Sequence, residues 1–430
     1  MEKGEAAKVI PINGVKSEAK YRFVKDMKCE VVQLKNGVKR NENTPVIMLE
    51  QEKDGLVRRK IHPLTEYLLK HKKKGGKYSA ITQNNKATLI VKFLNYVLID
   101  NAEKFKLKDF PDILFEHGTE FLNSLTEVNN ETLDRYANQL ARFYYFLAEN
   151  NLLKNITVDD FSVDVVQTAR GKVEVIENPF YGMEYNNNET PVLIHKLPLS
   201  LVVYFVDTAI MYAPRIALGI CFQFFGGLRL GEIINLKRSS MKVKGPSGEF
   251  GFVLNLKDTH MRDDLRHPVA GGSVKKKRRQ AVFPFGGKIF QKVYEMHMKQ
   301  NICKTDDNAL FVNADGNPMA DFTYRYYFEK VKAKFLERLR NSDIIELKHY
   351  AIELESVKWS THIGRGIFSN IISSISKNIL EIAQARGDGT LDAALSYLSD
   401  SDKMAIMLLD NDAEMWKYLE EATNEIMGEK

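Results

Sequence analysis

Two glycines lead into an arginine in the segment Gly226-Gly227-Leu228-Arg229-Leu230-Gly231-Glu232-Ile233-Ile234-Asn235-Leu236, which then continues as an amphipathic helix. Because glycine permits a tight turn, the arginine behind it can be held rigidly at the floor of a cleft. Glu232 follows Arg229 by three residues, shares its helix face and could orient the guanidinium group. An arginine and a glutamate at this spacing are more often a surface ion pair, so the segment indicates a site only together with other residues.

The residues on either side of this segment predict helices and one β hairpin. Apolar helices run from Leu197 into the segment, and helices dominate again from Leu310 onward. Alternating apolar residues predict one strand, at Phe250, Phe252, Leu254 and Leu256. A second strand ends at Ala281-Val282-Phe283-Pro284. We expect the fold class α+β, mainly α with a small β-sheet.

Helical periodicity also dominates from about Leu64 to Ile156. One apolar stripe follows a predicted N-cap at Thr82 and consists of Ile90, Phe93, Leu94, Val97 and Leu98. A second stripe consists of Leu133, Tyr136, Leu140, Phe143, Tyr144 and Leu147. The basic cluster from Lys70 to Lys77 lies between helices and is either a DNA clamp or a solvated charge run.

Turn signals divide the chain into five parts. Asp54-Gly55, between the apolar runs Pro45–Glu50 and Leu56–Ile61, predicts a small β hairpin. Between residues 158 and 197 the periodicity fades, as is typical of a linker. We therefore expect an N-terminal extension at residues 1–60, a helical domain at 61–160, a linker at 161–196, a larger domain at 197–410 and a tail helix at 411–430.

The charge is unevenly distributed along the chain. The net charge is +6 in 430 residues, but residues 400–430 hold nine acids and three bases and so carry −6, which leaves +12 on the preceding 399 residues. A basic body favours a polyanion because binding releases counterions, although a basic soluble surface explains the charge equally well.

Three widely separated cysteines, Cys29, Cys221 and Cys303, argue against a disulfide framework and a zinc site, and favour a reducing cytoplasm. The N-terminus lacks the apolar core of a signal peptide. The most apolar stretch, from Leu197 to Leu228, is interrupted by charged residues and a proline, which indicates buried helices rather than a membrane span.

Two further motifs follow the arginine segment. In Thr361-His362-Ile363-Gly364-Arg365, His362 and Arg365 share one face of a helical turn, so both could converge on one phosphate. Tyr397 follows Arg365 by 32 residues and lies beside an apolar stripe that does not include it. Alone, each motif is more often structural, but their order and spacing point to one chemistry.

The order of these motifs resembles the catalytic half of the tyrosine recombinase, or phage integrase, family. Along the chain they are GGLRLGE, a hairpin that ends in Val-Phe-Pro, HxxR and a tyrosine. The resemblance covers about Leu197 to Leu398, and the helical domain before it resembles the family's core-binding, DNA-clamp domain in layout. It implies that residues 197–410 form the catalytic domain.

The resemblance also assigns a hairpin lysine, eight residues before Pro284, which is Lys276, with Lys275 and Lys277 as rivals in the same basic run. The family normally has a histidine nine residues before the nucleophile, where this chain has Asp388. Since a carboxylate would repel a phosphate, Asp388 either supports Arg365 or Lys276, which we favour, or lowers the activity.

The resemblance implies a site-specific recombinase of a mobile genetic element, which cuts and rejoins DNA through a 3′-phosphotyrosine. Arg229, Arg365 and His362 would hold the phosphate, Lys276 would protonate the departing 5′ oxygen, and Tyr397 would be the nucleophile. Neither ATP nor a metal or other cofactor is expected. The expected partners are double-stranded DNA, further copies of the chain in a tetrameric synapse, and an accessory DNA-bending or directionality protein. We expect a cytoplasmic, nucleoid-associated protein that does not bind membranes.

Two other functions remain open at this point. A type IB topoisomerase shares this chemistry but relaxes supercoils without a second site, and a non-cleaving DNA-binding relative would explain Asp388. The acidic tail carries one apolar face, formed by Met415, Tyr418, Leu419, Ala422 and Ile426. The resemblance implies that this tail docks on a neighbouring protomer, whereas packing on its own domain is the alternative.

Overall fold

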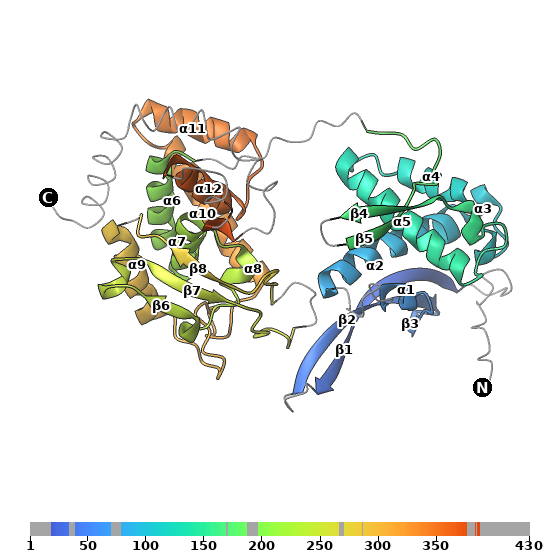
Figure 1. Ribbon diagram of the computed structural model, residues 1–430, viewed down its shortest axis with the longest axis horizontal. Coiled ribbons are helices and arrows are strands. Elements are labelled where there is room, and N and C mark those ends of the chain that lie inside the picture. The colour runs from blue at the N-terminus through green and yellow to red at the C-terminus, as the bar shows by residue number, and fades with distance from the viewer. Residues whose placement is uncertain are drawn as a thin grey trace. The chain divides into compact units, whose positions relative to one another are not determined.

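The computed structural model describes residues 19–33, 39–69, 79–168, 171–186, 197–265, 271–285, 287–375, 383 and 385–387. These residues form helices and small antiparallel sheets, which confirms the expected α+β class (Figure 1). The described residues form two compact units, the first up to residue 186 and the second from residue 197 onward. No helix among the described residues has both the length and the hydropathy that crossing a membrane requires.

The first unit begins with a three-stranded antiparallel sheet in the order β1-β2-β3. Its strands are β1 (Lys20–Gln33), β2 (Lys39–Lys53) and β3 (Leu56–Ile61). Asp54 and Gly55 both adopt positive φ angles, 54° and 74°, and form the two-residue turn between β2 and β3. The turn chemistry of this dipeptide therefore accounts for the hairpin.

Five α-helices complete the described part of this unit. They are α1 (Thr65–Leu69), α2 (Ala80–Asn95), α3 (Ala102–Phe105), α4 (Phe115–Asn123) and α5 (Asn130–Glu149). Two of them, α1 and α2, pack against the sheet. The buried Asn95 side chain of α2 accepts a hydrogen bond from the Phe23 N–H and donates one to the Phe23 carbonyl, both at 2.8 Å. Phe23 and Ile47 lie in the same apolar cluster as the helices, so the extension is part of this unit's core.

Two expectations for the first unit need correction. Helix α2 begins at Ala80, and its N-cap is Ser79, whose hydroxyl accepts the Thr82 N–H, so Thr82 is not the cap. The expected linker at residues 161–196 begins with an antiparallel strand pair, β4 (Val163–Thr168) and β5 (Gly171–Ile176). Phe161 and Phe180 on either side of this pair are buried in the unit's core, which explains why the segment is ordered there.

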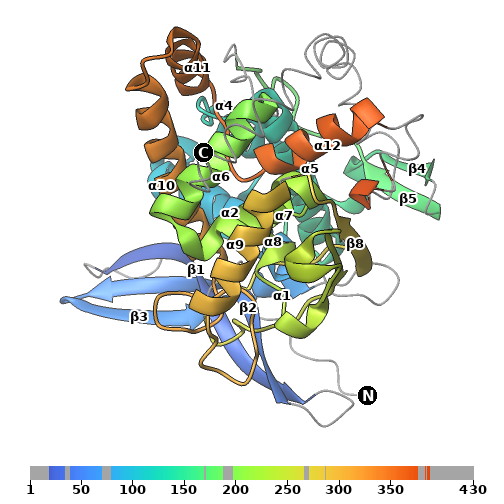
Figure 2. The same ribbon diagram turned by 90° about the vertical axis from the view of Figure 1, so that its left-hand side faces the viewer.

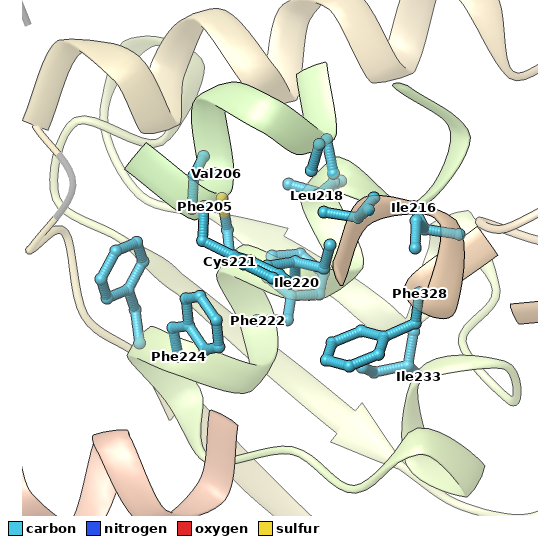
Figure 3. Packing of buried hydrophobic residues seen from close by; sticks show 14 of the residues in the cluster. Phe205, Val206, Ile216, Leu218, Ile220, Cys221, Phe222, Phe224, Ile233 and Phe328 are labelled. Atoms are coloured by element: carbon cyan, nitrogen blue, oxygen red, sulfur yellow. The ribbon is translucent and has the colours of Figure 1, made fainter. Parts of the chain in front are cut away.

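The second unit surrounds helix α7. Its helices are α6 (Leu199–Tyr212), α7 (Pro214–Gly226), α8 (Leu230–Ile233), α9 (Gly287–Gln300), α10 (Asp321–Arg340), α11 (Ile345–Ser356) and α12 (Ile363–Ile375). Every residue of α7 from Ile216 to Gly226 is buried, and aromatic side chains of α6 and α10 pack around it (Figure 3). Helix α11 packs against α10 (Figure 2). A helix buried on all sides is a rigid support for residues that follow it.

A small antiparallel sheet lies beside these helices. Its order is β6-β7-β8, with strands β6 (Met241–Val243), β7 (Phe252–Leu256) and β8 (Arg278–Val282). Phe250 was expected in β7 but precedes it and is 68% exposed, because Gly251 at φ 81° breaks the extended backbone. Residues 257–277 connect β7 to β8.

Candidate active site

The turn after α7 brings Arg229 to the surface of the core. Gly227 caps α7 in the left-handed conformation, at φ 63°, and its N–H donates to the Gln223 carbonyl. A Cβ atom at this position would overlap the ring of Phe368 on α12. Glycine is therefore required here both for the turn and for the close approach of α12.

Arg229 is the N-cap of the short helix α8. Its backbone N–H donates to Glu232 Oε2 at 2.9 Å, and its guanidinium Nη1 lies 3.5 Å from Glu232 Oε1. The Arg229 side chain is 29% exposed, whereas that of Glu232 is 1% exposed. The glutamate is thus buried beneath an arginine that solvent can reach.

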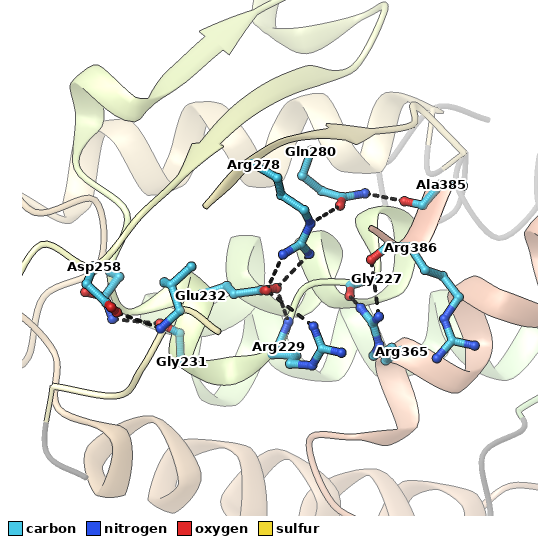
Figure 4. A network of polar contacts seen from close by, with 12 residues as sticks. Gly227, Arg229, Gly231, Glu232, Asp258, Arg278, Gln280, Arg365, Ala385 and Arg386 are labelled. Atoms are coloured by element: carbon cyan, nitrogen blue, oxygen red, sulfur yellow. Dashed lines mark hydrogen bonds and ion pairs between the residues drawn. The ribbon is translucent and has the colours of Figure 1, made fainter. Parts of the chain in front are cut away.

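Glu232 has a second and closer partner, Arg278 at the start of β8. Arg278 Nη1 lies 2.5 Å from Glu232 Oε1, and Nη2 lies 3.2 Å from Oε2 (Figure 4). Burial alone would raise the pKa of Glu232, but hydrogen bonding and charge from Arg278, followed by Arg229, outweigh it and leave the pKa below its usual value. The carboxyl group is therefore an anion shared by two arginines.

Arg365 reaches the same turn from α12. It is 4% exposed, and its Nη1 donates to the Gly227 carbonyl at 2.6 Å. Its Nη2 donates to the Arg386 carbonyl at 3.2 Å. Figure 4 shows the guanidinium groups of Arg229 and Arg365 on either side of the Gly227 turn. The fold thus brings together two arginines that lie far apart in the sequence.

His362 lies one turn before Arg365 and is exposed. Its carbonyl accepts the backbone N–H of Arg365 at 3.1 Å, which begins helix α12. The neighbouring Thr361 carbonyl accepts a hydrogen bond from the buried Gln223 of α7 at 3.2 Å. The imidazole is therefore presented at the surface by a turn that the core holds in place.

The lysine run precedes β8, and Lys275, Lys276 and Lys277 are all exposed. The connection that carries them is anchored to the site: Asp258 Oδ1 accepts the Val274 N–H at 2.6 Å. The buried Asn235 donates to the carbonyls of Gly231 and Gly271, at 2.8 and 2.7 Å. A Cβ atom on Gly231 would meet the backbone of Ser273, so this glycine allows the connection to approach α8.

The last described residues, 385–387, pack against β8. Gln280 donates to the Ala385 carbonyl at 2.6 Å, and Gly387 lies against the Arg278 side chain, where a Cβ atom would overlap it (Figure 4). Arg386 is 2% exposed. Asp388, Tyr397 and the tail helix, like the cluster from Lys70 to Lys77, lie outside the described residues.

Sequence reasoning missed Arg278, Gln280 and Asn235. A signal for the first two was present: alternation counted back from the buried Val282 places Gln280 and Arg278 on the inner face of β8. Polar residues at inward positions require partners, which are here Glu232 and the Ala385 carbonyl. Among the described residues there is no group of three or more potential metal-ligating side chains.

Comparison with known proteins gives matches among solved structures. No family model matches the chain, and no curated protein matches it. A XerH site-specific recombinase bound to palindromic difH substrate is 14% identical, with 79% of this chain and 80% of that chain covered, at a TM-score of 0.49. The Tn1549 transposon integrase in complex with a circular intermediate DNA is 12% identical, with 77% and 95% covered, at 0.49. A lambda integrase dimer bound to a COC′ core site is 11% identical, with 78% and 75% covered, at 0.49.

Proposed function

We propose that this chain is a tyrosine-type site-specific DNA recombinase, which cuts and rejoins double-stranded DNA through a 3′-phosphotyrosine bond to Tyr397. The observation that carries the proposal is that Arg365 binds the Gly227 carbonyl, two residues before Arg229, with His362 one helical turn from Arg365. The order of the motifs along the sequence supplies the remaining support.

The two arginines would bind the scissile phosphate. A phosphodiester resists attack because it is anionic, so its non-bridging oxygens need positive charge in the transition state. Guanidinium groups are permanently charged and donate in a fixed geometry. The exposed His362 would add a further hydrogen bond to the same phosphate.

The covalent step exchanges one phosphate ester for another. The Tyr397 hydroxyl gives its proton to solvent and its oxygen forms a bond to phosphorus, while the bond from phosphorus to the 5′ oxygen breaks. Lys276, or one of its neighbours Lys275 and Lys277, would give a proton to the departing 5′ oxygen. In rejoining, the 5′ hydroxyl of a partner strand attacks the phosphotyrosine and restores Tyr397. Because the ester energy is kept, the cycle needs neither ATP nor a metal.

The proposal includes an assembly of several copies. Strand exchange between two DNA sites requires a nucleophile for each strand, so we propose a tetramer of the chain on paired sites, with an accessory DNA-bending or directionality protein. Asp388, nine residues before Tyr397, would support Arg365 or Lys276 rather than face the phosphate.

The test is to trap the covalent intermediate. The protein is incubated in EDTA with a nicked duplex that carries the sequence flanking its gene, so that the cleaved fragment is lost and the adduct accumulates. We expect mass spectrometry to find the nucleotide on Tyr397, and Tyr397→Phe to bind the duplex without forming an adduct. A nucleotide attached to Tyr418, or no adduct with the unaltered chain, would refute the proposal.

A further inference from the structure

Glu232 is shared unequally between two arginines. Arg278 makes two contacts with its carboxylate, at 2.5 and 3.2 Å, whereas the guanidinium of Arg229 makes one, at 3.5 Å. Arg278 is also the more buried, with a side chain 9% exposed against 29% for Arg229. Arg278 therefore neutralises most of the Glu232 charge, and Arg229 neutralises little of it.

We propose that Arg278 is a positioning residue that occupies Glu232 and thereby prevents the Arg229 guanidinium from closing onto this carboxylate, so that Arg229 can bind a DNA phosphate. The inference rests on the proposed function, because it gives Arg229 the phosphate as its partner. Glu232 also caps α8 by accepting the Arg229 backbone N–H, so the carboxylate cannot be removed without loosening the segment that holds Arg229. With Arg278 bound to its carboxylate, Glu232 can cap α8 without also pairing with the Arg229 side chain.

The cost of burying a charge explains why the sharing matters. A carboxylate that is 1% exposed must be neutralised by a cation, because removing one partner of a buried ion pair leaves a strongly unfavourable charge. If Arg278 were lost, Arg229 would be the cation left within 4 Å of the Glu232 carboxylate in the described part of the chain. Its guanidinium would close onto Glu232 in a bidentate pair, as arginine does with carboxylates. It would then present less charge and fewer donors to a phosphate.

Arg278 is itself held in place from two directions. Its Nε donates to Gln280 Oε1 at 3.0 Å, and Gln280 donates to the Ala385 carbonyl at 2.6 Å. Gly387 packs against its side chain. These contacts fix the plane of the guanidinium, so that both of its terminal nitrogens face Glu232. A lysine has no such plane and could donate from only one nitrogen.

The experiment compares Arg278→Met with the double variant Glu232→Gln/Arg278→Met. Glutamine keeps an oxygen to cap α8 but has no charge to attract Arg229. We expect Arg278→Met to slow adduct formation on the nicked duplex by about tenfold or more, and the double variant to recover to within about threefold of the unaltered chain. A loss of folding stability would slow the variants in the same order, because a lone buried carboxylate is less favourable than the loss of both partners. Positioning is therefore distinguished from stability by the salt dependence of DNA binding, whose slope does not depend on the fraction of folded protein.

The control is Arg338→Met, which breaks a partly buried arginine–aspartate pair with Asp207 elsewhere in the same unit. It changes the net charge by the same amount as Arg278→Met, so it should keep the unaltered rate of adduct formation. If Arg278→Met reacts at the unaltered rate, or if the double variant is as slow as the single one, Arg278 does not position Arg229.

A second measurement separates this inference from the proposed function. Affinity for a short duplex of unrelated sequence is measured by fluorescence anisotropy over a range of salt concentrations. Losing one phosphate contact lowers the slope of log K against log salt by about 0.9. We expect that loss in Arg278→Met and its recovery in the double variant, even if no adduct forms and the proposed reaction is wrong. Equal slopes in all variants would overturn the inference.

Discussion

At the scale of single residues, the two site arginines perform different tasks. Arg229 is partly exposed, whereas Arg365 is almost wholly buried. Arg365 donates two hydrogen bonds, to the carbonyls of Gly227 and Arg386. Arginine has five donors in a rigid plane, so it can bind both carbonyls and still offer a nitrogen to a phosphate. Arg365 therefore joins the Gly227 turn to the segment at Arg386, and in the proposed function it would also bind the phosphate.

This arrangement predicts that Arg365 cannot be replaced by another cation. Arg365→Ala should reduce the rate of adduct formation by about a hundredfold or more, equivalent to about 3 kcal/mol in the transition state. Arg365→Lys should be nearly as slow, because a lysine cannot reach two carbonyls and a phosphate together. Both rates are measured by single-turnover trapping, with DNA affinity measured alongside. DNA affinity should remain close to normal, since many other cations bind the DNA backbone. Near-normal cleavage by either variant would contradict the assignment of Arg365.

At the scale of elements, helix α9 is tied to the core by His297. This residue is fully buried in the last turn of the helix, and its Nε2 lies 2.9 Å from the Leu310 carbonyl. Burial lowers the pKa of His297 to about 4, so the folded imidazole remains neutral. The unfolded chain, with an ordinary pKa near 6.5, binds more protons between about pH 4 and 6.5.

The second unit should therefore lose stability as the pH falls through that range. The loss due to His297 should reach about 3 kcal/mol in the free energy of unfolding by pH 4. Trp359 is buried in the core of the second unit, so its fluorescence in denaturant titrations of a Trp416→Phe background reports on that unit. His297→Gln keeps a donor for the Leu310 carbonyl and should remove this part of the pH dependence. Identical pH profiles for the two proteins would show that His297 does not contribute it.

A separate loss is expected at more acidic pH, beginning near pH 4.5. Because the pKa of Glu232 is lowered by its arginines, it contributes stability above its unfolded pKa, near 4.5, and loses it as the pH falls through the lower folded value. The two contributions therefore occupy different pH windows, and only the upper one should respond to His297→Gln.

At the scale of the whole molecule, the acidic tail is proposed to link protomers. Its apolar stripe repeats at helical spacing from Met415 to Ile426, beyond the described residues. Deleting residues 410–430 should leave DNA binding intact but abolish recombination between paired sites, because subunits would bind without being coupled. The measurements are a gel-shift assay and a two-site recombination assay. Normal recombination by the shortened chain would indicate that the tail packs on its own domain instead.

The parts of the fold that depend on neighbouring residues could be predicted from the sequence. Asp54-Gly55 predicts the hairpin between β2 and β3, and the apolar stripes predict α2 and α5, because turn geometry and helix periodicity act over a few residues. The pair of strands at residues 163–176 was missed, since its order depends on Phe161 and Phe180 docking into a core built by other helices.

For the candidate site, the sequence alone determined which residues we propose for the chemistry, namely Arg229, His362 and Arg365, through their types and their order. Only the tertiary structure decided how their charges are shared. Glu232 lies three residues from Arg229, yet its closer partner is Arg278, 46 residues away on β8. A sequence pattern over a few residues predicts only which side chains can meet along one helix face. Which cation reaches a buried carboxylate depends on how a strand packs against that helix, and this follows only from the folding of the whole unit.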